Sequence, residues 1–267
     1  MLKIIDGVGL VQFENLAASG MVRHCVTTRI GGVSPPPYDS LNMGLSTGDA
    51  RENVLENIRR LSGVCGWKME NIAISHQMHD ADIRNMSIAD MGKGIFREQD
   101  YQNIDGMVTS DKNLVLMTYY ADCVPLLFLD ARRGAIACVH AGWRGTLANI
   151  GGAAIAKMAA EFNSDPADIL VGIGPSISAK NFQVGPDVYE EFIYQLPFAG
   201  DFMYNDFGDR RRLDLWGINR RLLEDAGVDP ANIEISGFCT YEREDLFFSH
   251  RRDGAARGSI AALIELI

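Results

Sequence analysis

The chain has 267 residues, of which 47% are hydrophobic and 22% charged, a composition typical of a globular protein with a sizeable core. Its net charge of −10 argues against a nucleic-acid polymer as the main partner, because neutralising phosphates requires a basic surface. No apolar run approaches the ~20 residues that cross a bilayer, and the N-terminal stretch lacks the basic start of a signal peptide. Five scattered cysteines without a CxxC motif indicate a reducing compartment, so we predict a cytoplasmic protein with no membrane partner.

The first part of the chain predicts strands around one helix and one irregular loop. The loop, Arg29 to Pro37, contains two glycines and three prolines, too many for a regular element. Asp49 is a candidate helix cap, and apolar residues at helical spacing follow it as far as Leu61. This helix is expected to end near Gly63 to Gly66. The expected strands cover residues 3–12, Met21–Thr28 and Asn71–Ser75.

The stretch from Asn113 to Thr146 is the centre of the chain's chemistry. Asp122 and Cys123 lie side by side between two apolar runs, and His140 follows a third. Two glycines and an arginine come next, which favours ligand binding because glycine allows close approach and a helix N-terminus offers backbone donors. The three apolar runs are predicted strands: Leu114–Met117, Val124–Leu129 and Ala135–Val139.

The remaining elements are predicted mainly as helices. Gly151 and Gly152 within the first of these lower helix propensity by roughly 1 kcal/mol each, which indicates close packing against another element. We expect a strand over Asp245–Ser249 and a final helix over Ser259–Leu266. No linker divides the chain, so we predict one domain over residues 1–267. The other predicted helices are Thr146–Phe162, Asp187–Leu196 and Asp214–Ala226.

A similar joint between helix and strand recurs near residues 70, 166 and 230. Each joint follows a predicted helix and leads through a strand to a polar or glycine-rich end, and two of them contain Asp-Pro. An internal duplication would explain the likeness, but repeated use of one good capping sequence is the simpler interpretation. In both cases the chemically interesting residues lie just beyond strand ends.

Several motifs in order resemble one known family, the multicopper polyphenol oxidase or laccase-domain proteins. The motifs are ADCVPLLFLD, HAGWRGT, TTRIGGVS, SLN, HQMH, DGMVT, GPSISAKNFQVG and FFSHRRDG. Members of that family include purine nucleoside phosphorylases with adenosine deaminase side activity. The resemblance covers nearly the whole chain, and it implies an α+β fold with mixed β-sheets layered between helices, an α/β/β/α sandwich.

The resemblance also implies a metal site. Spacing alone predicts none, because His79, Cys123 and His140 lie far apart in the sequence. The family's Gln-x-His, Ala-Asp-Cys and His-Ala-Gly-Trp steps match at these three positions, which implies one cluster that binds zinc, with copper as the alternative metal. His76 and His79 would point to opposite sides of a continuing strand, so only His79 is expected in the cluster. Asp80 stands where the family usually has glycine.

The implied substrates are purine nucleosides and phosphate. Asn42 and three arginines are the candidate substrate and phosphate ligands: Arg29, Arg144 and Arg252. Asp122 is a candidate general base or orienting carboxylate, although a turn-capping role fits it equally well. The family often has Gly-Arg where this chain has Gly258-Ser259, and Arg257 is the residue that could replace the missing arginine. The protein is expected to be a monomer or homodimer.

Three other functions fit parts of the sequence. A thiol hydrolase or deamidase would use Cys123 as nucleophile and His140 as base. A copper-dependent polyphenol oxidase would need many histidine ligands, and the chain has five histidines, of which only His76 and His79 are close in sequence. A non-enzymatic binding module would turn over no nucleoside.

Overall fold

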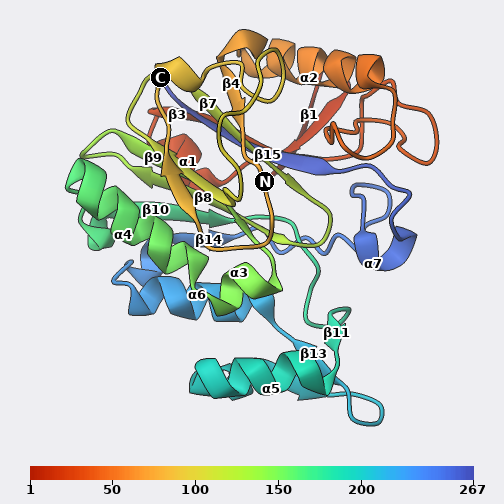
Figure 1. Ribbon diagram of the computed structural model, residues 1–267, viewed down its shortest axis with the longest axis vertical. Coiled ribbons are helices and arrows are strands. Elements are labelled where there is room, and N and C mark those ends of the chain that lie inside the picture. The colour runs from red at the N-terminus through yellow and green to blue at the C-terminus, as the bar shows by residue number, and fades with distance from the viewer.

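The computed structural model describes residues 1–267 and shows an α+β protein built on two large β-sheets (Figure 1). The first sheet has six strands, and all its neighbours are antiparallel except β4, which runs parallel to β7. In spatial order these strands are β1 (Leu2–Ile5), β2 (Val8–Val11), β3 (Val22–Thr27), β15 (Ile260–Leu266), β7 (Val115–Tyr120) and β4 (Ile72–Ile74).

The second sheet also has six strands, antiparallel at its centre and parallel at both edges. In spatial order they are β14 (Ile233–Ile235), β10 (Ile169–Ile173), β8 (Val124–Asp130), β9 (Ala135–Ala141), β6 (Gly106–Thr109) and β5 (Ile83–Asn85). A small third sheet stands apart with helix α5 at one end of the molecule (Figure 1); it consists of β11 (Gln183–Val184), β13 (Arg211–Leu213) and β12 (Met203–Asn205).

Helices cover the outer faces of the two large sheets, with α2 on one side and α4 and α6 on the other (Figure 1). Short 3-10 turns join several elements, as at Ile88–Asp90 and Pro197–Phe202. The α-helices are α1 (Glu14–Ala18), α2 (Arg51–Cys65), α3 (Trp143–Leu147), α4 (Ile150–Phe162), α5 (Pro186–Gln195), α6 (Leu215–Asp225) and α7 (His250–Asp253).

Three hydrophobic cores hold the four layers together. One core lies between the sheets, where Leu116 of β7 and Leu127 of β8 are both fully buried. A second packs α2 against the outer face of the first sheet, and the third packs α4 and α6 against the outer face of the second. This order of helix, sheet, sheet and helix confirms the predicted α+β sandwich.

The predicted helix over Ser259–Leu266 is wrong, because these residues form strand β15 at the centre of the first sheet. Leu263 contributes to the core under α2, whereas its neighbour Ile264 contributes to the core between the sheets. Burial on both faces makes a strand read as one continuous apolar run, which local propensity alone cannot distinguish from a helix. The one charged residue, Glu265, is buried and pairs with Arg23 at 2.9 Å.

Other predicted elements differ in smaller ways. Residues 3–12 form a two-stranded hairpin, since Asp6 and Gly7 between β1 and β2 both take positive φ angles. Asp245–Ser249 forms the end of a turn and an irregular segment instead of a strand. The N-cap of α2 is Ala50 instead of Asp49, whose carboxylate accepts hydrogen bonds from the side chains of its neighbours.

The predicted helix over Thr146–Phe162 is broken in two at Asn149. This residue takes a left-handed conformation with φ of 56°, and its side chain accepts a hydrogen bond from Gly152 N to cap α4. A Cβ at Gly151 would lie 3.3 Å from Leu223 of α6, so the predicted close packing against another element is confirmed there. A Cβ at Gly152 would instead meet the side chain of Asn149, which caps the same helix.

The three recurring joints are short 3-10 turns, each leading into a strand. Asp165 and Asp229 each cap their turn by accepting from the backbone amide two residues later, with proline at the first position. Local capping therefore accounts for the likeness of the second and third joints, whereas the first begins after Lys68 and has no side-chain cap. The turns are Met69–Asn71, Pro166–Asp168 and Pro230–Asn232. No helix in the structure combines the length and apolar character needed to span a membrane.

Candidate metal and substrate site

The structure brings together His79, Cys123 and His140 from three separate segments. Their ligand atoms all lie within 4.8 Å of one another, and the two imidazole rings meet edge to face with centroids 5.0 Å apart. His79 follows β4, Cys123 lies between β7 and β8, and His140 lies near the end of β9. His76 is not in this cluster: its Nδ1 accepts a hydrogen bond from the Asn103 amide.

Unusual backbone conformations aim these side chains. His79 has a φ of 63° and Asp122, next to Cys123, a φ of 84°, both in the left-handed region that side chains other than glycine rarely adopt. Gly142 packs against the cluster: an added Cβ would lie 3.0 Å from the His79 ring and 3.3 Å from Cys123 Sγ, so a side chain here would crowd both ligands. Backbone strain of this kind persists where the surrounding structure holds it, and it concentrates at functional sites.

Asp105 orients both histidines, a role that no local pattern in the sequence indicates. Its Oδ1 lies 2.8 Å from His140 Nδ1, and its two oxygens accept hydrogen bonds from the amides of Met78, His79 and Asp80. The carboxylate is fully buried at the start of β6. With His140 Nδ1–H donating to Asp105, Nε2 is left free to face Cys123, which is how a carboxylate commonly fixes a metal-ligating histidine.

The electrostatics of the cluster favour an ionised thiol. Burial raises the pKa of Cys123, but the charge and hydrogen bonds of His140 and His79 outweigh it and bring this pKa to about 6. Burial lowers the pKa of His140, but Cys123 and Asp105 raise it to about 9. A metal requires cysteine as the thiolate, so the donor set fits zinc: two imidazoles and one thiolate leave a fourth position open.

Asp122 lies beside the cluster with its carboxylate engaged by the protein. Oδ1 accepts from the Thr240 hydroxyl at 2.7 Å, and Oδ2 accepts from the Ser249 hydroxyl and the Arg251 amide. These bonds tie the turn that carries Cys123 to the segment that begins α7. The geometry therefore supports an orienting role for Asp122.

Three of the predicted phosphate ligands lie elsewhere. Asn42 is fully buried, and its amide binds Thr47, Asp49 and the backbone of Ser259. Arg29 and Arg252 pair with Asp39 and Asp253 and donate to backbone carbonyls. Arg29 and Arg252 line a cavity of about 700 Å³, and none of His79, Cys123 and His140 lines it.

Two other cavities meet at the cluster. The larger, about 580 Å³, is called here the arginine chamber because its wall includes Arg144, Arg210, Arg251 and Arg257. The smaller, about 460 Å³, is called the polar chamber because uncharged side chains such as Ser46, Gln77, Gln99 and Tyr119 dominate the polar part of its wall. Four residues line both: His79, Ala121, Cys123 and Arg257.

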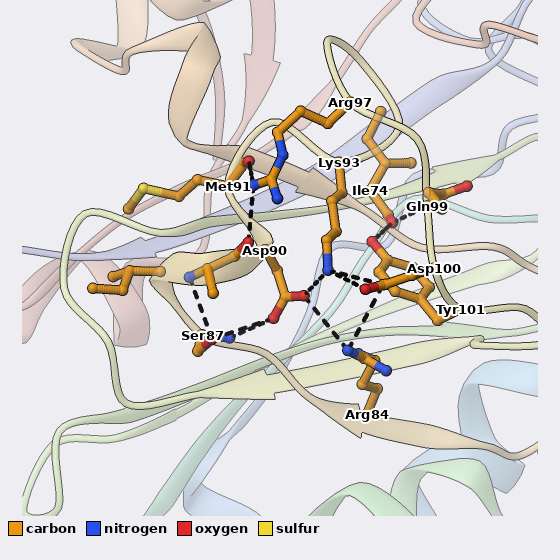
Figure 2. Close-up of polar contacts among 12 residues, drawn as sticks. Ile74, Arg84, Ser87, Asp90, Met91, Lys93, Arg97, Gln99, Asp100 and Tyr101 are labelled. Atoms are coloured by element: carbon orange, nitrogen blue, oxygen red, sulfur yellow. Dashed lines mark hydrogen bonds and ion pairs between the residues drawn. The ribbon is translucent and has the colours of Figure 1, made fainter.

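An ion-pair network around Lys93 lies next to one wall of the polar chamber, and Figure 2 shows its contacts. Lys93 is 6% exposed, and its ammonium lies 2.7 Å from Asp90 and 2.8 Å from Asp100. Beside it, Gln99 Nε2 donates to the carbonyl of Ile74 on β4. The ion pairs hold the segment from Asp90 to Asp100 together, and hydrogen bonds from Gln99 and Tyr101 to the Ile74 carbonyl attach it to β4. Gly94 and Gln99 of this segment reach the chamber.

Comparison with known proteins shows which family the chain belongs to. The sequence matches the family model described as multi-copper polyphenol oxidoreductase laccase over residues 23–267. The chain belongs to this family. It is 34% identical to the purine nucleoside phosphorylase YlmD of Bacillus subtilis (strain 168), over 89% of this chain and 86% of that one. It is 33% identical to a purine nucleoside phosphorylase of Bacteroides thetaiotaomicron, over 97% of both chains.

Solved structures of the family share the fold. YfiH of Bacillus licheniformis, described as a hypothetical protein, matches with a TM-score of 0.91 and 32% identity, over 100% of this chain and 99% of that one. YlmD of Geobacillus stearothermophilus matches with a TM-score of 0.90 and 33% identity, over 99% and 97% of the two chains. The resemblance of the sequence motifs to the laccase-domain family is therefore confirmed.

Proposed function

We propose that the protein is a zinc-dependent purine nucleoside phosphorylase. It would cleave adenosine, inosine or methylthioadenosine with phosphate, giving the free base and a ribose 1-phosphate. The observation that carries the proposal is the cluster of His79, Cys123 and His140 at the junction of two chambers. The names of its relatives support the same reaction class.

His79, Cys123 and His140 would hold the zinc, with Asp105 keeping His140 in the tautomer that a ligand needs. A bound zinc supplies a positive charge that polarises oxygen ligands and lowers the pKa of water to about 7. Asp122 keeps the Cys123 turn in place, and the backbone at Gly142 leaves room for the cluster. Adenosine deamination at the same site would exchange the 6-amino group for a water oxygen and release ammonia.

A thiol hydrolase or deamidase is the second candidate, and one observation favours it. Cys123 with a pKa of about 6 beside His140 with a pKa of about 9 forms a thiolate–imidazolium pair when no metal is present. Nucleophilic cysteines in hydrolases have the same arrangement. Phenol oxidation by several coppers has less support, because only two of the five histidines lie in the cluster.

We also propose that the protein works in the cytoplasm on small molecules, as a monomer or homodimer. All five cysteines are free in the structure, which supports a reducing compartment.

The deciding experiment combines metal analysis with nucleoside turnover by the purified protein, with and without phosphate. We expect one zinc per chain, adenine and ribose 1-phosphate only when phosphate is present, and loss of both zinc and turnover in Cys123→Ala. Inosine formed from adenosine without phosphate would support the deaminase activity. Metal-free protein that leaves nucleosides intact would contradict the proposal and favour the thiol hydrolase.

A further inference from the structure

We propose that the two chambers divide the substrates of phosphorolysis: the arginine chamber binds inorganic phosphate, and the polar chamber binds the nucleoside. The inference rests on the proposed function, and it adds which side of the cluster each substrate occupies. Three sets of observations carry it: the partners of the arginines, the composition of the polar chamber, and the residues that both chambers share.

The arginines of the arginine chamber have no carboxylate partners, in contrast to Arg29 and Arg252 of the 700 Å³ cavity. Arg144 lies over the ring of Trp143 at 4.2 Å, and Arg251 lies over Phe182 at 5.4 Å. Aromatic rings hold a guanidinium in place without neutralising its charge. The Arg144 guanidinium makes no hydrogen bond to the protein, and that of Arg251 donates from only one terminal nitrogen, to the Gln183 carbonyl, so both keep their charge and further donors for an anion.

Arg257, at the junction of the chambers, also has no carboxylate partner. One terminal nitrogen donates to the carbonyl of Gly258 and to the Ser259 hydroxyl, but Nε is buried and has no partner. A buried donor without a partner costs about 1–3 kcal/mol, so a ligand that accepts from it would recover that free energy. A phosphate oxygen beside Cys123 would be such an acceptor.

Carboxylates in the arginine chamber do not cancel its positive charge. Asp122 is occupied by two hydroxyls and the Arg251 amide, and Asp187 on α5 is the other acid in the wall. Four guanidinium groups against two carboxylates leave a positive chamber in a chain whose net charge is −10. Planar guanidinium donors match phosphate oxygens in pairs, so a phosphoryl anion is the ligand that this chamber suits.

The polar chamber suits an uncharged molecule. Its wall contains no carboxylate, and Arg257 is its one guanidinium. The cluster borders both chambers, so the difference between them lies in the guanidinium donors: a phosphate in the polar chamber would meet one arginine, and in the arginine chamber it would meet four. The volume of about 460 Å³ lies within the ~300–1,000 Å³ typical of small-molecule sites. The Tyr119 hydroxyl, which is buried without a partner, and the exposed Ser46 hydroxyl can bind a nucleoside, and the Tyr119 ring offers it a flat apolar surface. The amides of Gln77 and Gln99 bind the protein's own backbone.

The shared wall brings the reacting atoms together. Because His79, Cys123 and Arg257 line both chambers, substrates bound on either side would meet at the cluster. A phosphate oxygen would form the new bond to C1′ of the ribose as the bond from C1′ to the purine nitrogen breaks. The electron pair of that bond leaves with the purine, which takes up the proton of hydrogen phosphate, directly or through water.

The test separates the two substrates with one variant in each chamber. Arg144→Met keeps an apolar side chain on Trp143 but removes the charge, and we expect it to raise the KM and Kd for inorganic phosphate at least tenfold. The KM for inosine should stay within twofold. Ser46→Phe places a ring from an exposed loop into the polar chamber. We expect it to raise the KM and Kd for inosine at least tenfold and to leave the KM for phosphate within twofold. Arg133→Met, in the exposed turn between β8 and β9, is the matched control and should change neither.

Calorimetric titration of the zinc-loaded protein with phosphate, and separately with inosine, measures binding apart from turnover. Arg210→Met, on the exposed hairpin of the small sheet, repeats the phosphate test should Arg144→Met unfold. Variants from both chambers that weaken the same substrate, or that show the reversed pattern, would overturn the inference while the wild-type activity still supports the function. Wild-type protein that cleaves no nucleoside would instead defeat the proposed function.

A phosphorylated nucleoside carries the same anionic group, and a further titration distinguishes it. We expect adenosine 5′-monophosphate to bind no more tightly than adenosine, with an affinity that Arg144→Met leaves within twofold. Tighter binding that depends on Arg144, with inorganic phosphate unaffected by the variant, would show that the chamber holds a nucleotide and would overturn the division of substrates.

Discussion

Asp105 connects the two histidines of the cluster, since it binds His140 Nδ1 and the backbone amide of His79. We expect Asp105→Asn to weaken zinc binding by about 10–100-fold, the range typical for loss of a histidine's carboxylate partner. Asparagine offers one acceptor oxygen, which cannot serve both the imidazole and three backbone amides. Competition for zinc with a chromogenic chelator measures the affinity.

A neighbouring carboxylate supplies the control for Asp105. Asp80 is exposed, and its side chain accepts only from the Ala81 amide. Asp80→Asn should therefore keep the zinc affinity of the wild type. Equal losses in the two variants would mean that negative charge near the site, and not the orientation of His140, determines the affinity.

The ionised thiol gives a second prediction at the residue scale. Because the pKa of Cys123 is lowered to about 6, its thiolate persists well below the usual range, and alkylation should slow only as the pH falls through about 6. In His140→Gln the imidazolium is lost, so burial should dominate and move the midpoint above pH 8. Iodoacetamide labelling of metal-free protein, followed by mass spectrometry of the Cys123 peptide, measures the profile.

Other cysteines provide internal references for that experiment. Burial raises the pKa of Cys25, and it raises the pKa of Cys138 to about 12, so neither should react near neutral pH. A Cys123 profile that is the same in wild type and His140→Gln would contradict the assigned ion pair.

Sequence reasoning identified the ligands better than their supports. The motif match placed His79, Cys123 and His140 at one cluster, and the structure brings them together. Asp105 belongs to the DGMVT motif, but its role cannot be predicted from that motif. Its partners lie 25 to 35 residues away in the chain, and no local sequence pattern indicates them. Residue type alone makes Arg29 and Arg252 candidate phosphate ligands, and their internal ion pairs emerge only from the fold.

At the scale of elements, the break between α3 and α4 depends on one side chain. Asn149→Ala loses the cap of α4, at about 1–2 kcal/mol, and places alanine in a left-handed conformation that costs a similar amount. Asn149→Gly should cost only a few tenths of a kcal/mol, because glycine tolerates both the φ angle and the N-cap position. Urea unfolding measures both losses. Equal midpoints for the two variants would exclude a contribution from backbone strain.

Helices with one apolar face are easier to predict from this sequence than the strand that is buried on both faces. Helices such as α2 and α6 keep one apolar face, so their periodicity is visible in the sequence. β15 is buried on both faces and rich in alanine, leucine and isoleucine, so its pattern has no period of two. The hairpin of β1 and β2 carried a clear Asp-Gly turn signal, which weak alternation over residues 3–12 obscured.

Over the whole molecule, the four layers are linked through shared sheets. Each large sheet contributes side chains to two cores, so removal of an outer helix layer would expose the back of a sheet that also forms the central core. This arrangement supports the proposal that residues 1–267 fold as one domain, because no core is independent of its neighbour.

We therefore expect a single cooperative unfolding transition, seen equally at both ends of the stack. Trp67 packs in the core under α2, whereas Trp143 and Trp216 pack against the core of α4 and α6. Fluorescence of Trp67→Phe reports the α6 side, and that of the Trp143→Phe, Trp216→Phe double variant reports the α2 side. Each urea midpoint should coincide with the midpoint from circular dichroism of the same variant. If fluorescence changes at lower urea than circular dichroism for either reporter, that outer layer detaches first, and the layers are separate folding units joined only by contact.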